Sequence, residues 1–426
     1  MKTTTPSFLS RRQFLGGSLA AVAASSLSSP AADASAVALA KAESAPAAPA
    51  ALPPAPAYPR KLKLGVIGNG GRGSWIAKLF QAHGGYDLWA VADYFPEVAD
   101  KCGEQLGVDR ARRFSTLSGY KRLIESGVEA VAVETPPYFI PEHVSAAVDA
   151  GLHVYMAKPV AADVPGALRV AAAGELSTRR ERCFLVDYQM STDPVNLEVA
   201  ARIRDGGLGR MARVVTTGVC GGFKDPPKTA TLESRLRNLI WINDVAMGCD
   251  YIGNYDIHAI DAALWVLGQR PVAASGASSI QRPNPHGDAR DVCAVNYEYA
   301  DGVIHQHLGQ ALKNNNPDEL SAAFHGTEAN AVLNYWGKAF LRGGKKHFGG
   351  GTVEGLYAAG AERNIARFYR EVTRGSFAND TCQRAVDGVL TCVLGYEAAD
   401  RHTRLTMDAL IKENKRMDVD LTGLKS

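Results

Sequence analysis

The sequence has few of the features that mark specialised classes of protein. Its seven cysteines are an odd number without a C-x-x-C pair, so it predicts neither a disulfide framework nor a zinc site. The net charge is only +3 over 426 residues, which argues against nucleic acid as a partner. No apolar run in the body of the chain approaches the length of a membrane-spanning helix. At 46% hydrophobic and 21% charged residues, the composition is typical of a globular protein with two or three domains.

The N-terminus is expected to lie outside the folded body. Residues 10–15, SRRQFL, hold a twin-arginine pair, and a weakly apolar segment follows over residues 14–27. This pattern predicts a signal peptide over residues 1–34 that the twin-arginine (Tat) machinery exports, and hence a periplasmic or secreted protein. Residues 35–60 are rich in Ala and Pro and predict a linker without a core of its own. Because this route exports folded proteins, it suits a protein that already holds a cofactor.

The most informative stretch is residues 63–73, KLGVIGNGGRG, in which an apolar strand runs into the spacing G-x-G-x-x-G. Gly68 allows a tight turn, Gly70 lets the backbone approach a pyrophosphate, and Gly73 allows close packing of the next helix. That helix should begin near Arg72 and direct its first amide groups at the phosphates. The stretch therefore predicts a dinucleotide site. Its expected cofactor contacts are Gly68, Asn69, Gly70, Gly71, Arg72 and Gly73.

A second apolar run, residues 88–92, ends at Asp93, twenty residues after Gly73. A carboxylate at this place can accept hydrogen bonds from a ribose diol. The same charge would repel a 2'-phosphate, so the sequence favours NAD over NADP. NADP stays open, because Lys101 can also reach a phosphate from nearby.

Between residues 63 and 183, short apolar runs alternate with longer amphipathic ones, which is typical of a parallel sheet with crossover helices. The expected strands are residues 64–68, 88–93, 130–134, 153–156 and 183–186. Ligands of such sheets bind outside the carboxyl ends of the strands. Two strand ends therefore stand out: residues 134–138, ETPPY, with His143 in the next helix, and residues 156–160, MAKPV.

Lys158 is a candidate for catalysis on its own chemistry. It precedes a proline at the carboxyl edge of the expected sheet, where a nicotinamide ring would end. Its ammonium group can hydrogen-bond a substrate hydroxyl and stabilise the alkoxide that develops as hydride leaves.

The second half of the chain contains a second candidate, His258. Residues 249–268 have helical spacing, which places His258 on one face with Asn254 and Asp261 while Asp256 points elsewhere. A histidine over a substrate hydroxyl is suited to act as a general base. The polar residues 220–241 are expected to form a loop over the substrate site.

Other segments of the C-terminal half predict helices and strands. A helix is expected over residues 194–205, followed by a strand over residues 212–219. Alternating segments between residues 271 and 340 fit an antiparallel sheet, and residues 354–373 and 381–402 fit two helices. His305 and His307 share a strand face without an obvious partner acid, so we predict a structural role and no metal. Residues 345–351 are glycine-rich and expected to be mobile.

The order of these motifs resembles the glucose-fructose oxidoreductase / inositol dehydrogenase / MocA family. The resemblance rests on the glycine loop, the strand ending in Asp93, the T-P pair before His143, the A-G-x-H-V-x-x-x-K-P stretch and Tyr188-Gln189. It implies an α/β fold, with a Rossmann domain over residues 61–190. It also implies a C-terminal α+β domain over residues 191–426, with a mostly antiparallel open sheet. The further cofactor contacts that it implies are Thr135, Pro136, His143, Lys158, Tyr188 and Gln189.

Two positions depart from the family pattern. The family usually reads Glu-Lys-Pro where this chain has Ala157 before the lysine, which removes a carboxylate that can orient it. Family members commonly carry an Asp four residues before the catalytic His or Tyr, and this chain has Asn254. An amide cannot stabilise an imidazolium ion, so either Asp261 supplies that charge or the mechanism differs. The candidate catalytic residues are Lys158, His258, Asn254 and Asp261.

The resemblance implies an NAD(P)-dependent oxidoreductase acting on a sugar or polyol. Outside the cytoplasm free nicotinamide is scarce, so the cofactor is expected to stay tightly bound. One alternative is a redox-neutral glycoside hydrolase that works by oxidation, elimination and hydration. Its extra base would be one of Tyr138, Tyr188, Tyr255 or His258. A sugar-binding protein without turnover is the third possibility, and the exposed sheet face of the family fold implies a homo-oligomer.

Overall fold

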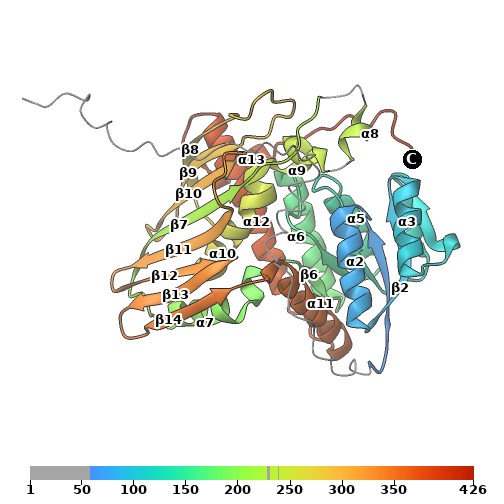
Figure 1. Cartoon of the computed structure of the whole chain (residues 1–426), viewed down its shortest axis with the longest axis horizontal. Coiled ribbons are helices and arrows are strands. Elements are labelled where there is room, and N and C mark those ends of the chain that lie inside the picture. Colours follow the sequence, from blue (N-terminus) through green and yellow to red (C-terminus); the bar gives the residue numbers. More distant parts are fainter. Residues whose placement is uncertain (1–57, 228–230, 238) are drawn as a thin grey trace, which may run out of the picture.

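The computed structural model describes residues 58–227, 231–237 and 239–426. The predicted signal peptide and all but the last three residues of the predicted linker lie outside these ranges. Figure 1 shows two sheets side by side, with the longest helices of the C-terminal half between them. Among the described residues, no helix combines the length and the apolar character that a membrane crossing requires.

The first sheet is parallel and has the strand order β3-β2-β1-β4-β5-β6. Its strands are β1 (Leu62–Ile67), β2 (Tyr86–Asp93), β3 (Arg113–Ser115), β4 (Ala130–Val133), β5 (His153–Met156) and β6 (Phe184–Val186). The five strands expected from sequence are present with ends within two residues, and the Rossmann-like α/β fold is confirmed. Strand β3 was missed because it has only three residues, all half-buried.

Crossover helices cover both faces of this sheet. They are α2 (Gly71–His83), α3 (Pro96–Leu106), α4 (Gly119–Glu125), α5 (Ile140–Asp149) and α6 (Val164–Arg179), with the 3-10 turn η1 (Arg110–Arg112) before β3. Strands β1, β4 and β5 are buried on both sides, as a sheet covered by helices on both faces requires.

The second sheet has the order β14-β13-β12-β11-β7-β10-β9-β8-β15. Its strands are β7 (Met211–Cys220), β8 (Ala273–Ser279), β9 (Val292–Glu298), β10 (Ile304–Ala311), β11 (Glu319–Gly326), β12 (Ala329–Asn334), β13 (Gly337–Gly343), β14 (Phe348–Val353) and β15 (Leu405–Thr406). Its ladders are antiparallel except for β10 and β7, which pair in parallel. The mostly antiparallel sheet is thus confirmed. Residues 345–351 were expected to be mobile, but part of this segment forms β14, which pairs with β13.

The remaining helices pack on the inner side of the second sheet or return to the first domain. They are η2 (Met190–Thr192), α7 (Pro194–Arg204), α8 (Leu232–Arg235), η3 (Ile240–Asn243), α9 (Val245–Gly248), η4 (Ile252–Asp256), α10 (Ile257–Leu267), α11 (Leu356–Arg374), α12 (Asp380–Asp400) and α13 (Met407–Glu413). Helix α12 contacts β8 and β9 on one side and α6 and β6 on the other (Figure 1). Helix α11 packs against α2. The C-terminal helices therefore hold the two sheets together.

The last residues of the predicted linker belong to the folded body. The Tyr58 ring lies edge-on to Tyr369, with ring centroids 4.8 Å apart. The Tyr369 hydroxyl donates a hydrogen bond of 2.6 Å to the backbone carbonyl of Arg60. Helix α11 thus anchors the chain just before β1.

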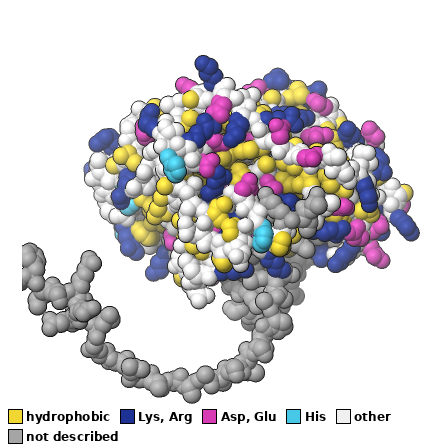
Figure 2. Space-filling model, turned by 90° about the horizontal axis from the view of Figure 1, so that it is seen from above, with side chains coloured by type: hydrophobic (Ala, Val, Ile, Leu, Met, Phe, Trp, Pro, Cys, Tyr) yellow, Lys and Arg dark blue, Asp and Glu magenta, His cyan; other side chains and the backbone are white. Residues whose placement is uncertain are grey.

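Figure 2 looks onto the top of the molecule in the view of Figure 1. Hydrophobic side chains form a band across the middle of this face, and side chains of both charge signs are interspersed around it. All seven cysteines lie among the described residues and are free thiols. Six of them are buried, as small apolar residues would be.

Candidate functional site

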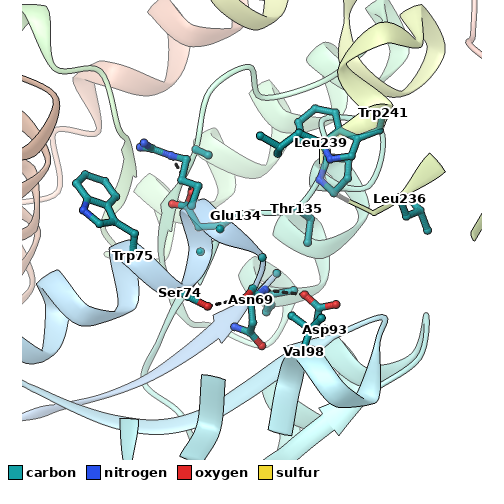
Figure 3. A pocket seen from close by; sticks show the side chains of 18 of the residues that line it. Asn69, Ser74, Trp75, Asp93, Val98, Glu134, Thr135, Leu236, Leu239 and Trp241 are labelled. Atoms are coloured by element: carbon teal, nitrogen blue, oxygen red, sulfur yellow. Dashed lines mark hydrogen bonds and ion pairs between the residues drawn. The ribbon is translucent and has the colours of Figure 1, made fainter. Parts of the chain in front are cut away.

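A cavity of about 1090 Å³ opens at the carboxyl ends of the parallel strands. Its walls come from the glycine loop after β1, the ends of β2, β4 and β5, the turn η4 with α10, and part of the insertion after β7. Figure 3 shows Asn69, Ser74 and Asp93 on one wall and Leu239 and Trp241 facing them from the insertion. The volume is large enough for a dinucleotide, and the position is the one that open α/β sheets use for ligands.

The glycine loop has the geometry that a pyrophosphate requires. Gly68 has a φ of +88°, and a Cβ atom there would lie 2.8 Å from the carbonyl oxygen of Glu134. A Cβ atom at Gly73 would overlap the carbonyl oxygen of Gly68. Gly70 and Gly71 instead have open space where a side chain would project. The backbone amides at the start of α2 are therefore accessible to an anion, and the residues present fit an NAD pyrophosphate.

Gly70 permits a test that separates cofactor binding from folding. Its φ is −63°, which alanine adopts without strain, and no protein atom lies within 4 Å of the added Cβ. Gly70→Ala should leave the melting temperature of the nucleotide-free protein unchanged. The methyl group should displace the pyrophosphate and raise the Kd for NAD at least about tenfold, or about 1.4 kcal/mol. Calorimetric titration of stripped protein measures this Kd, and an unchanged value would contradict the placement of the phosphates.

Asp93 lies beside the place where a ribose of the cofactor would bind. Its Oδ2 accepts a 2.7 Å hydrogen bond from the Asn69 amide, and its Oδ1 accepts one of 3.0 Å from the Phe95 amide. Burial raises the pKa of this carboxyl, and the two amide bonds oppose that rise. Val98 lies on the same side, facing Leu236 across the cavity (Figure 3). This apolar slot beside a carboxylate suits an adenosine.

Arg72, within the glycine loop, does not direct its guanidinium at the phosphate position. Its Nε lies 3.1 Å from Glu134 Oε2, a second nitrogen lies 2.5 Å from Asp187 Oδ2, and a third donates to the Tyr357 hydroxyl at 3.0 Å. The Tyr357 ring stacks on Trp75, with centroids 4.6 Å apart. Because the guanidinium is engaged elsewhere, only the backbone of Arg72 is available for the predicted contact with the cofactor.

Lys158 follows β5 and lies half-buried in the wall of the cavity. Its Nζ donates a 2.5 Å hydrogen bond to the backbone carbonyl of Asn254. Burial, and next the positive charge of Arg72, lower its pKa from 10.5 to about 7, while Asp187 and Glu134 oppose this shift. At neutral pH, much of the lysine is a neutral amine that can accept a proton.

His258 lies in the first turn of α10 and lines the same cavity. Its ring contacts Tyr335 edge-on, with centroids 5.1 Å apart, and its Nδ1 has no hydrogen-bond partner among the described residues. Burial, and then the charges of Lys158 and Arg72, lower its pKa well below 6.5. The imidazole is therefore neutral.

Of the two alternatives for the counter-charge of His258, the structure does not support the one in which Asp261 supplies it. Asp261 Oδ1 accepts a 2.7 Å hydrogen bond from Arg384 Nε, and the residue does not line the cavity. Helical spacing predicts His258 and Asp261 on the same face of the helix, but the Asp261 carboxylate pairs with Arg384 of α12. His258 thus lacks the charged partner that a strong general base needs.

Asn254 also differs from its expected role. It lies in η4, a π-helical turn, which alters the register that the α-helical spacing assumed. Its side-chain amide donates to the Gly248 carbonyl at 3.5 Å, and the structure records no hydrogen bond from this amide to His258. The contribution of Asn254 to the site is its backbone carbonyl, which binds Lys158.

The remaining predicted cofactor contacts divide into two groups. Thr135, Pro136 and His143 line the cavity, and the Thr135 hydroxyl lies 3.1 Å from His143 Nδ1. Burial lowers the pKa of His143 to about 4. Tyr188 and Gln189 do not line the cavity; Gln189 Oε1 instead accepts a 3.2 Å hydrogen bond from the Tyr335 hydroxyl. The structure therefore does not support direct cofactor contacts for these two residues.

Sequence reasoning missed several residues of the site. The aromatic side chains of Tyr335 and Tyr357 line the cavity from distant parts of the chain, without a local motif to indicate them, whereas Trp241 belongs to the segment that was expected to cover the site. Glu134 and Asp187 had a signal, because each is an acid that directly follows a parallel strand.

His305 and His307 belong to a buried network behind this cavity. The Thr216 hydroxyl lies 2.7 Å from His305 Nε2 and 3.0 Å from His307 Nδ1. His307 Nε2 lies 3.0 Å from Asp256 Oδ2, so the partner acid that the sequence did not reveal is Asp256. Asp256, Cys293 and His307 place their ligand atoms within 4.8 Å of one another, close enough to hold a metal ion. Their hydrogen bonds join η4 to the second sheet.

Comparison with known proteins places this architecture in a family. Residues 62–186 match the model of an oxidoreductase family with an NAD-binding Rossmann fold, and residues 196–332 match the GFO/IDH/MocA C-terminal domain.

Curated relatives are distant. Inositol 2-dehydrogenase of Rhizobium meliloti is 23% identical over 55% of this chain and 63% of its own length. Levoglucosan dehydrogenase of Pseudarthrobacter phenanthrenivorans is 22% identical over 65% of this chain and 74% of its own length. A 2,7-anhydro-N-acetylneuraminate hydratase of Mediterraneibacter gnavus is 25% identical over 55% of this chain and 58% of its own length.

Solved structures share the fold over most of the chain. A levoglucosan dehydrogenase in complex with NADH and levoglucosan has a TM-score of 0.68 at 18% identity, covering 82% of this chain and all of that one. The aldose-aldose oxidoreductase of Caulobacter crescentus has a TM-score of 0.65 at 20% identity, with the same coverage. The chain belongs to the GFO/IDH/MocA family of oxidoreductases, with an NAD-binding Rossmann domain.

Proposed function

We propose that this protein oxidises a hydroxyl group of a sugar or polyol with a tightly held NAD. The observation that carries the proposal is the half-buried Lys158 just after β5, which lines the same cavity as the glycine loop and whose pKa is lowered to about 7. The names of the relatives, inositol and levoglucosan dehydrogenases, support a polyhydroxylated substrate.

The residues of the cavity divide the work of this reaction. Bound NAD⁺ supplies the acceptor for the hydride that leaves the substrate carbon. Lys158, held by the Asn254 carbonyl, takes the hydroxyl proton and is the general base. His258 is neutral and poorly basic, so it hydrogen-bonds and orients the substrate. This reverses the roles that the sequence suggested for the two side chains.

The rate of oxidation should follow the protonation of Lys158. Below pH 7 its ammonium group cannot accept the substrate proton, whereas above its pKa of about 7 the amine is free. The rate of nicotinamide reduction at saturating substrate should therefore rise between about pH 6 and 8 and then level off. Stopped-flow absorbance over this range measures the profile. A rate that is flat across it would contradict Lys158 as the base.

The insertion after β7 supports retention of the cofactor. A guanidinium nitrogen of Arg237 lies 2.9 Å from Glu97 Oε1, and the group lies 3.8 Å from the centre of the Phe95 ring. Both partners belong to the Rossmann domain beside Asp93, while Leu239 and Trp241 line the cavity. The insertion thus spans the adenosine end of the cavity. We propose that it slows release of the nucleotide, as a Tat-exported periplasmic or secreted enzyme would need.

A redox-neutral reaction is the second candidate, because one relative is named a hydratase. Of the four bases that the sequence suggested for it, Tyr138 and Tyr188 do not line the cavity. Tyr255 does, but its hydroxyl donates to the Val219 carbonyl at 3.2 Å. Product analysis distinguishes this candidate from the oxidoreductase.

We also propose that the protein forms a homo-oligomer through the outer face of its second sheet. Ile304 and Leu308 of β10 are each 52% exposed on that face. Light scattering of the purified protein tests this proposal.

A further inference from the structure

The residues after α13 leave the second domain and return to the first. Figure 1 shows this segment in red, running from α13 to its end above α3. On the way, the Met417 amide donates a 2.8 Å hydrogen bond to Asp163 Oδ2, at the start of α6. Over residues 417–421, half-buried hydrophobic side chains alternate with exposed acidic ones. We call residues 414–426 the strap, because they connect the two domains outside the helices.

The far end of the strap binds two loops that line the cavity. The Lys425 amide donates a 3.1 Å hydrogen bond to the Tyr94 hydroxyl, and the Lys425 carbonyl accepts one of 2.9 Å from the Leu117 amide. Tyr94 follows Asp93 at the end of β2, and Leu117 lies between β3 and α4. Both residues line the cavity. One residue of the strap therefore ties together two loops beside the ribose position.

One of these loops has a strained backbone. Thr116 has a φ of +76°, a conformation that a β-branched residue rarely adopts and that costs free energy. Its amide donates to the Tyr94 carbonyl at 3.2 Å, and the next amide, that of Leu117, donates to the strap. Thr116 also lines the cavity. Strained backbone persists only where the surrounding contacts fix it, and it gathers at ligand sites. The strap supplies one of these contacts.

The residues that follow Tyr94 are held by a second segment of the C-terminal half. The Tyr94 and Phe95 rings contact edge-on, with centroids 4.9 Å apart. Arg237 of the insertion lies over the Phe95 ring and pairs with Glu97 at 2.9 Å. The turn after β2 is thus bound by the strap at its first residue and by the insertion at the residues beyond.

We infer that the strap closes the adenosine end of the cofactor site, where it holds the loops of Tyr94 and Leu117 in place around the nucleotide and slows its release. The inference rests on the proposed retention of NAD. A nucleotide that leaves between these loops must first break contacts made by residues about three hundred positions further along the chain. Lys425 is a positioning residue, which acts through the two loops and not on the cofactor itself.

The test is the rate at which nucleotide-loaded protein releases NAD. A chain that ends at Lys415 lacks most of the strap but keeps every helix and strand of the described structure. It should release NAD at least about tenfold faster than the wild type, because both hydrogen bonds of Lys425 are lost. Timed gel filtration after dilution into excess ADP-ribose measures this rate. The measurement needs no substrate, so it does not depend on whether the protein oxidises a sugar.

A second variant removes a single hydrogen bond. Tyr94→Phe keeps the ring beside Phe95 but removes the hydroxyl that binds the strap. Release of NAD should become about two- to tenfold faster, the range expected for the loss of one hydrogen bond. The matched control is Asp418→Asn, an exposed residue of the strap whose carboxylate pairs only with Arg416 of the same segment. This control should release NAD at the wild-type rate.

The melting temperature of the nucleotide-free proteins separates this role from a merely structural one. A strap that served only the fold would lower this temperature in the shortened protein and leave the release rate unchanged, which would overturn the inference. If the shortened chain does not fold, Tyr94→Phe decides, and a wild-type release rate in that variant overturns the inference.

The wild type distinguishes failure of this inference from failure of the proposed function. Slow release from the wild type and from both variants would overturn the role of the strap and leave the retention of NAD intact. Rapid release from the wild type itself would overturn the proposed retention, and the inference with it.

Discussion

Methionine in place of Lys158 is expected to lower the rate of nicotinamide reduction by about 10³-fold, because the general base is lost. The thioether side chain retains much of the lysine volume, and the glycine loop is untouched. The variant should therefore fold and keep its nucleotide. Single-turnover absorbance with a panel of sugars and polyols measures the rate, and chromatography of the denatured protein measures the bound nucleotide.

The matched control for this change is Lys338→Met, which removes an exposed lysine on β13 that does not line the cavity. It should leave both rate and nucleotide content as in the wild type. If Lys158→Met instead retains a rate within a few-fold of the wild type, Lys158 is not the base. If it loses its nucleotide as well as its activity, the lysine acts first in cofactor binding.

A methyl group at Gly73 should affect both folding and cofactor binding. It would overlap the carbonyl group of Gly68, which is backbone and cannot rotate away, so the loop must open. Such overpacking costs about 1–3 kcal/mol of unfolding free energy. Denaturant melts of Gly73→Ala should show this loss, and the purified variant should lack nucleotide.

Gly70→Ala is the matched comparison within the same loop, because its added methyl group meets no protein atom. The two variants should both bind NAD poorly, but only Gly73→Ala should be less stable without nucleotide. Equal stabilities for the two stripped proteins would show that the tight packing at Gly73 does not matter for the fold.

Local patterns explain what the sequence could predict. Hydrophobic periodicity located the parallel strands, and the spacing of Gly68, Gly70 and Gly73 located the loop, since both depend on residues close together in the chain. Lys158 was identified for the same reason, because it lies two residues after the end of a buried strand.

The errors concern pairs that are distant in the chain or depend on irregular backbone. Asp261 pairs with Arg384, more than a hundred residues away, so helical spacing could not show that the carboxylate was already engaged. Asp256 pairs with His307 across the interface of η4 and the second sheet. The π-helical turn at Asn254 has no reliable signature in sequence, and it changed which group of this residue enters the site.

The central claim is tested most directly by mass spectrometry of products after the purified, nucleotide-loaded protein is incubated with a panel of free sugars, polyols and glycosides. The account predicts a product two hydrogens lighter than its substrate, together with a reduced nicotinamide or a second, reduced sugar. A glycoside cleaved with the gain of one water, without any lighter product, would contradict it and establish a redox-neutral hydrolase.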